Sequence, residues 1–172
     1  MMRAGRWVAA ALVAALLAGC GYTLGGNLPP HVKTVAVPIF KNLTQEPGIE
    51  TVITAAIVTS FGNSGRLRVV PVTQADSIIE GEVVAYTVES IGYDTSQNAQ
   101  QFRLWVTLNV KFRDLKTNSM LWEQQNLRER SDFRATGQVA QGASTLSLEE
   151  GATRQAALEI GRQVVSMALD RF

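Results

Sequence analysis

The chain has 172 residues, with 16 Lys and Arg against 15 Asp and Glu, so its formal net charge is +1. This length suits one domain with its own hydrophobic core, and the near-neutral balance gives no bulk electrostatic reason to bind nucleic acid. A single cysteine and a single histidine exclude a disulfide within the chain and a metal site built from several Cys or His ligands.

The first 19 residues predict an export signal. Arg3 and Arg6 precede an apolar run over residues 8–17, and small residues follow it just before Cys20. The run is about half the roughly 20 residues that a membrane span needs, and its order is typical of a secretory signal. Because a cysteine follows at once, residues 1–19 resemble a bacterial lipoprotein signal, which implies that Cys20 becomes the acylated N-terminus. The alternative is an uncleaved apolar helix that happens to end in cysteine.

Residues 20–32 are rich in Gly and Pro and predict a tether between the lipidated end and one domain at residues 33–172. The alternative is a terminal stretch that lies on the domain. A β-branched run at residues 33–40 predicts the first strand, and Pro38 should place it at a sheet edge or end it there. The polar residues 41–46 predict a loop.

Residues 47–61 predict a helix, because apolar side chains recur there at helical spacing. These side chains are Ile49, Val52, Ile53, Ala56, Ile57 and Phe61. Gly62 and Gly65 suit the end of the helix, and the β-branched content means that packing must hold it. A short strand is expected at residues 66–71.

Residues 77–90 predict a longer strand whose alternation is imperfect around residues 80–82, and the polar residues 91–101 predict a loop. Residues 102–113 then alternate cleanly, with Leu104, Val106, Leu108, Val110 and Phe112 on one face. This pattern predicts a half-buried antiparallel strand. A turn in which Asn118 suits a positive φ leads to a partner strand at residues 119–133.

Residues 134–147 predict a connection, and residues 148–172 a last helix with an apolar stripe from Ala157 to Phe172. The pattern as a whole predicts an α+β fold, a two-layer sandwich of two helices packed on a small mixed or antiparallel sheet of about four strands.

Catalytic motifs are scarce. His31 lies between Pro30 and Val32, and a hydrolase would need it oriented by an acid and facing a nucleophile. The sequence contains no Gly-x-Ser-x-Gly elbow and no phosphate-binding glycine loop. We therefore expect an exposed loop histidine, no enzymatic activity, no cofactor and no metal site. A hydrolase that uses His31 is the alternative.

The polar face of the 102–113 strand predicts a non-catalytic binding site. Its candidate residues are Arg103, Trp105, Lys111 and Arg113, joined by Arg128 and Arg130 on the partner strand and Arg134 at its exit. Guanidinium groups pair well with phosphate and Trp covers apolar chain, so this face would suit a phosphorylated, acylated ligand. The alternative is a solvated face of interleaved charges that include Glu123, Glu129 and Asp132.

Several motifs in order resemble the lipopolysaccharide-assembly lipoproteins, the LptE family. The motifs are Cys20-Gly21-Tyr22-Thr23-Leu24, residues 35–44 leading into Pro47-Gly48-Ile49-Glu50, Ala75-Asp76 before a strand with Gly81, and Asp114 and Leu121-Trp122 framing a hairpin. The resemblance spans essentially the whole mature chain.

The resemblance implies two helices on a small sheet and an outer-membrane lipoprotein that faces the periplasm. It also implies one copy that plugs and helps assemble a β-barrel partner, LptD, and takes part in inserting lipopolysaccharide into the outer leaflet. Residues 91–101 carry no Lys or Arg, although some relatives have a basic residue there that is tied to lipopolysaccharide contact. The alternative is a lipoprotein subunit of a secretion pore of the curli-secretion type.

Overall fold

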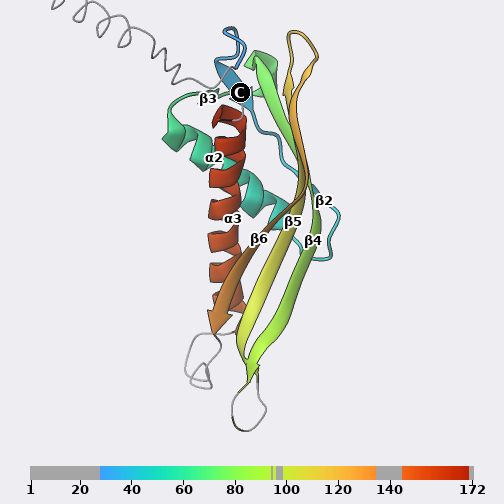
Figure 1. Cartoon of the computed structure of the whole chain (residues 1–172), viewed down its shortest axis with the longest axis vertical. Helices are drawn as coiled ribbons and strands as arrows, with labels where there is room; N and C mark the ends of the chain where they lie inside the picture. Colours follow the sequence, from blue (N-terminus) through green and yellow to red (C-terminus); the bar gives the residue numbers. More distant parts are fainter. Residues whose placement is uncertain (1–27, 94, 96–98, 135–144, 171–172) are drawn as a thin grey trace, which may run out of the picture.

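A computed structural model describes residues 28–93, 95, 99–134 and 145–170. Two helices pack on one face of a mixed sheet (Figure 1). The elements are β1 (Thr34–Ala36), β2 (Lys41–Asn42), α2 (Ile49–Ser64), β3 (Arg68–Val69), a short 3-10 helix η1 (Val72–Gln74), β4 (Ser77–Tyr93), β5 (Ala99–Asp114), β6 (Met120–Arg134) and α3 (Thr145–Asp170). The predicted α+β class is confirmed, but the sheet has six strands rather than about four.

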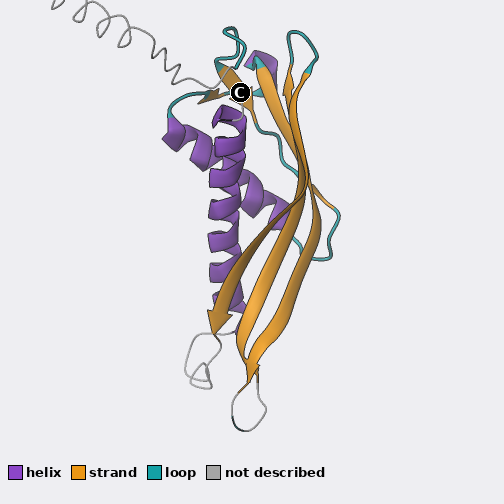
Figure 2. Ribbon diagram, in the orientation of Figure 1, coloured by secondary structure: helices purple, strands orange, loops and turns teal. Residues whose placement is uncertain are grey.

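The sheet order is β3-β1-β4-β5-β6, and β2 also pairs with β4. The short strands β1, β2 and β3 make parallel pairs, whereas β4, β5 and β6 form a long antiparallel meander beside α3 (Figure 2). β1 and β2 come from one continuous stretch that follows the same edge of β4, interrupted around Pro38 as the sequence predicts.

Two of the predicted loops are wrong in part. The hairpin between β4 and β5 continues to the pair Tyr93 and Ala99, so most of the expected loop at 91–101 is strand. Its polar side chains fit a hairpin whose faces are largely solvated. Part of the expected loop at 41–46 is β2, because Lys41 and Asn42 find partners on β4.

Gly81 explains the imperfect alternation of β4. A Cβ placed on Gly81 would lie 2.1 Å from a ring carbon of Phe40, so the absence of a side chain leaves a notch that the buried Phe40 ring fills. Two residues later, the register with β5 shifts between Val83 and Ala85. This bulge lies where β2 ends, and it changes which side chains of β4 face the helices.

The core lies between the sheet and the two helices. The predicted apolar face of β5 is fully buried, and Ile53, Ile57 and Phe61 of α2 pack into the same cluster as Ile160 and Val164 of α3. The helices cross closely, since a Cβ on Gly161 would lie 2.7 Å from the carbonyl oxygen of Ala56.

Two predicted backbone features are confirmed. Asn118 has φ +52° in the β5–β6 turn, and α2 ends at Gly65 in the left-handed conformation.

Candidate functional site

Trp105 lies at the centre of the outer face, the side of β4, β5 and β6 that points away from α2 and α3. The guanidinium of Arg128 on β6 lies 3.8 Å from the Trp105 ring centroid, and that of Arg103 lies 5.9 Å away. The indole Nε1 donates to Glu89 on β4 at 2.7 Å. The register explains this grouping, because Trp105 is directly opposite Thr87 on one side and Arg130 on the other.

The cations of this cluster differ in how far they are neutralised. Arg103 donates twice to Asp132, at 2.7 and 2.8 Å, and this guanidinium holds the pKa of the Asp132 carboxyl below its usual range, with a smaller contribution from Arg130. Among the described residues, Arg128 forms no ion pair with a carboxylate, and neither does Arg130.

Lys111 and Arg113 lie apart from the Trp105 cluster. Lys111 is six residues further along β5, roughly 20 Å at the rise of a strand. It pairs with Glu123 at 3.6 Å, and Arg113 pairs with Glu80 at 2.9 Å. The structure therefore gathers Arg103, Trp105, Arg128 and Arg130, whereas Lys111 and Arg113 form separate ion pairs toward the β5–β6 turn.

This arrangement is suited to binding a ligand that has both an anionic group and an apolar part. The Arg128 guanidinium has donors for a phosphate oxygen, and a cation held over an indole ring retains its charge. The Trp105 ring adds an apolar surface of the kind that covers an acyl chain.

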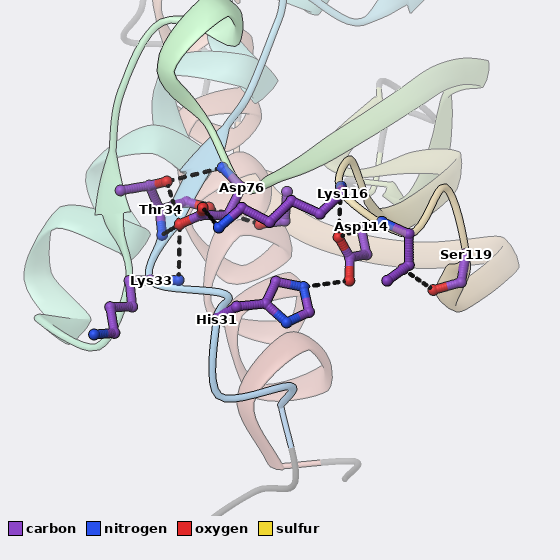
Figure 3. Close-up of polar contacts among 9 residues, drawn as sticks. His31, Lys33, Thr34, Asp76, Asp114, Lys116 and Ser119 are labelled. Carbon is purple, nitrogen blue, oxygen red and sulfur yellow. Dashed lines mark hydrogen bonds and ion pairs between the residues drawn. The ribbon is translucent and has the colours of Figure 1, made fainter.

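A second polar cluster joins the start of β1 to the β5–β6 turn (Figure 3). His31 Nε2 donates to Asp114 Oδ2 at 2.6 Å, and the Asp114 side chain is only 1% exposed. Burial raises the pKa of Asp114, but hydrogen bonds from Thr117, from the Lys116 backbone and from His31 outweigh it and lower the pKa overall. His31 lies in a turn, as expected, but its side chain is only 33% exposed and is held by Asp114, so the expectation of an exposed loop histidine is confirmed only in part.

Asp76 completes this cluster. Its carboxylate binds Lys116 Nζ at 2.9 Å and accepts from the Thr34 hydroxyl at 2.8 Å and from the backbone of Lys33 and Thr34. Chiefly through Lys116 and Thr34, these contacts hold the pKa of Asp76 well below its usual range. The two carboxylates thus fix the chain where residues 28–33 enter the domain.

The polar cluster shows no catalytic arrangement. In the part of the chain that the structure describes, no hydroxyl or thiol is hydrogen-bonded to His31. Sequence reasoning named Asp76 and Asp114 only among the motifs of the family resemblance and assigned neither of them a contact or a role.

No group of three or more His, Cys, Asp or Glu in the described ranges could hold a metal ion. No helix there is long and apolar enough to cross a membrane.

The fold is shared with solved bacterial proteins. A protein from Xanthomonas campestris matches with a TM-score of 0.56 at 11% identity, covering 78% of this chain and 82% of that one. A hypothetical protein from Chlamydia trachomatis matches with a TM-score of 0.53 at 10% identity, covering 78% and 94%. The uncharacterized lipoprotein B of Nitrosomonas europaea has a TM-score of 0.44 at 18% identity, covering 84% and 93%. No protein of curated function matches the sequence.

The family is shown by the sequence itself. The model of the LptE family, described as lipopolysaccharide-assembly, matches residues 32–168, which is nearly all of the described domain. The chain belongs to the LptE family, and the resemblance noted in the sequence is confirmed.

Proposed function

We propose that this protein is a lipoprotein of the outer membrane that plugs and helps assemble an LptD-type β-barrel and takes part in inserting lipopolysaccharide into the outer leaflet. Cys20 carries the lipid and holds the domain on the periplasmic side. One copy binds one barrel, and no enzymatic step is part of this role.

Family membership over residues 32–168 is the observation that carries the proposal. Cys20 lies outside the described residues, so the anchor rests on the sequence of residues 1–20 alone. The polar outer face is consistent with a plug, because the lumen of a transmembrane barrel is polar and offers hydrogen-bonding partners.

For the ligand, we propose that lipopolysaccharide contacts the outer face. The six candidates are Arg103, Trp105, Lys111, Arg113, Arg128 and Arg130. Arg128 and Arg130 form the core of the proposed site, because an anion can bind them without first breaking an ion pair. A phosphate that bound Arg103, Lys111 or Arg113 would compete with the carboxylates that already hold them.

The partner is tested by purifying the tagged lipoprotein in mild detergent and counting the copies of each protein that comes with it. A one-to-one complex with a large β-barrel supports the plug. A ring of copies of this chain with no barrel would contradict it and favour the secretion-pore alternative.

The ligand site is tested by binding of purified lipopolysaccharide to Trp105→Ala/Arg128→Ala, with Arg162→Ala as the control. Arg162 is an exposed arginine on α3 that pairs with Glu159. A charge-assisted hydrogen bond contributes about 1.5–3 kcal/mol, so we expect roughly tenfold weaker binding or more for the double variant and none of this loss for the control.

The triple variant at Arg103, Lys111 and Arg113 should also weaken binding, but less than the loss of Arg128. Unchanged affinity in both the double and the triple variant would leave the outer face without a role in lipopolysaccharide binding.

A further inference from the structure

β4 has a free edge over much of its length. On the side away from β5, it pairs with β1 at Ser77 and Ile78 and with β2 at Glu82 and Val83. The last bond on this side is the Leu43 N–H to the Val83 carbonyl oxygen, at 2.9 Å. Within the described ranges nothing pairs with residues 84–93 on this edge, and Figure 1 shows that part of β4 at the margin of the sheet.

The opposite margin of the sheet is different. α3 runs beside β6 (Figure 1), and Gln163 on α3 donates to Glu129 on β6. Among the strands, α3 packs chiefly on β6 and also contacts β5. α3 therefore packs beside β6, whereas no helix of the described residues lies along the outer margin of β4.

Register irregularities flank the stretch from Ala85 to Ser90 on both sides, but the free edge lacks the other features that usually protect such strands. Natural proteins place Lys, Pro or a covering segment on exposed edges to prevent pairing with another chain. Residues 84–93 contain no Lys, Arg or Pro, and their one charge, Glu89, is bound to Trp105. Ile91 and Tyr93 are 39% and 64% exposed. The register with β5 is regular from Ala85 to Ser90, and that stretch can accept a further strand.

A groove lies beside the start of this edge, at residues 84–86. One cavity, of about 360 Å³, lies between residues 43–46 and residues 84–86. A second, of about 510 Å³, is lined by Tyr86 and by the first turns of α2 and α3. Glu46 and Tyr86 line both cavities, so the two form one groove that passes residues 84–86, the start of the unpaired part of β4.

The larger cavity has both apolar and charged lining residues. Ile49 and Val52 are among its apolar residues, and three carboxylates, Glu46, Glu149 and Glu150, outnumber its one cation, Arg154. Glu149 accepts from the Tyr86 hydroxyl at 2.9 Å, and Glu150 is paired with Arg154 at 3.5 Å. No described cation pairs with Glu46. The net negative charge complements basic side chains.

We propose that residues 85–90 of β4 accept an extended segment of the barrel partner as an added strand, with apolar and basic side chains of that segment in the groove. In strand addition, main-chain hydrogen bonds provide affinity and alternate side chains provide specificity. The inference rests on the proposed function only in requiring a barrel partner. A second copy of this chain is a poorer occupant, because it would bring the same carboxylates to the same edge.

Hydrogen exchange tests the backbone bonds directly. Amide exchange is measured on the purified lipoprotein alone and in its detergent-purified complex with the barrel. We expect alternate amides within residues 85–90 to exchange roughly tenfold more slowly, or more, in the complex, because only hydrogen-bonded amides are protected. Side-chain contact without strand addition would not produce the alternation.

Matched variants test the same edge in the cell. Val88→Lys places a charge on the free edge, and Val72→Lys places one on η1, where valine is also exposed. We expect Val88→Lys to lower recovery of the complex roughly tenfold and Val72→Lys to leave it unchanged. Glu46→Lys should lower recovery as well, whereas Glu159→Lys on α3 should not.

The outcomes separate this proposal from the proposed function. A stable one-to-one complex in which residues 85–90 exchange as in the free protein overturns strand addition and leaves the plug intact. Protection of these residues in a dimer of the chain alone assigns the edge to a second copy and overturns the proposal. Failure to recover any barrel overturns both.

Discussion

The close approach of Phe40 to Gly81 predicts that Gly81→Ala lowers the stability of the protein, whereas an ordinary Gly→Ala change in a strand raises it. Gly→Ala in extended backbone normally stabilises a protein by about 0.4–1 kcal/mol, because alanine has less freedom in the unfolded chain. Here the new methyl would lie 2.1–2.7 Å from three ring atoms of Phe40, and Phe40 is only 3% exposed. Overpacking of this kind costs about 1–3 kcal/mol, so Gly81→Ala should destabilise the protein by about 1–2 kcal/mol.

The assay is urea unfolding followed by circular dichroism, with Gly62→Ala as the matched control. A Cβ on Gly62 meets nothing within 4 Å, and an exposed helical Gly→Ala change should stabilise by roughly 0.5–1 kcal/mol. Phe40→Leu shortens the side chain in the notch, so it should partly rescue Gly81→Ala, with a coupling energy of about 0.5 kcal/mol or more. If Gly81→Ala stabilised the protein, or if the free-energy changes of Gly81→Ala and Phe40→Leu simply added, the Phe40 ring would not fill the space beside Gly81.

Three further predictions concern the helix crossing, the polar cluster and the anchor. Gly161→Ala should cost about 1–3 kcal/mol by urea unfolding, because the methyl would meet Ala56; no loss would show that the crossing is loose. Since the fold lowers the pKa of Asp76, this carboxylate stabilises the protein above about pH 4 and ceases to do so as the pH falls. The stability difference between Asp76→Asn and the parent should therefore be largest near pH 7 and shrink below about pH 4, and a constant difference would contradict that sign. Cys20→Ser should abolish palmitate labelling, and a processed variant that is still labelled would disprove the anchor.

The sequence predicted the features that depend on local pattern. The strict alternation of residues 102–113 matches the buried and exposed faces of β5, and the apolar spacing of the two helices matches their packing faces. Asn118 took its positive φ because an asparagine in a short turn accepts that conformation at low cost. These features depend only on the pattern of residues that lie close together in the sequence.

The candidate site could be predicted only in part. Alternation places Arg103 and Trp105 on one face from sequence alone. The register decides which carboxylate each cation meets, and therefore that Arg103 is paired with Asp132 whereas Arg128 stacks on Trp105. A shift of one residue would exchange all these partners, and the register of β5 with β6 shifts between Leu108 and Val110 and between Phe112 and Arg113, which the sequence pattern did not predict.

By itself the sequence determined the fold class and the likeness to the LptE family, since each depends on residue order and periodicity, and it predicts a lipoprotein signal at residues 1–20. Only the tertiary structure decided that residues 41–42 become β2, that Phe40 fills the notch at Gly81, and that His31 binds Asp114. It also decided that β4 keeps a free edge beyond Val83. Each of these contacts joins residues far apart in the chain, so its energy exists only once packing and register bring the partners together.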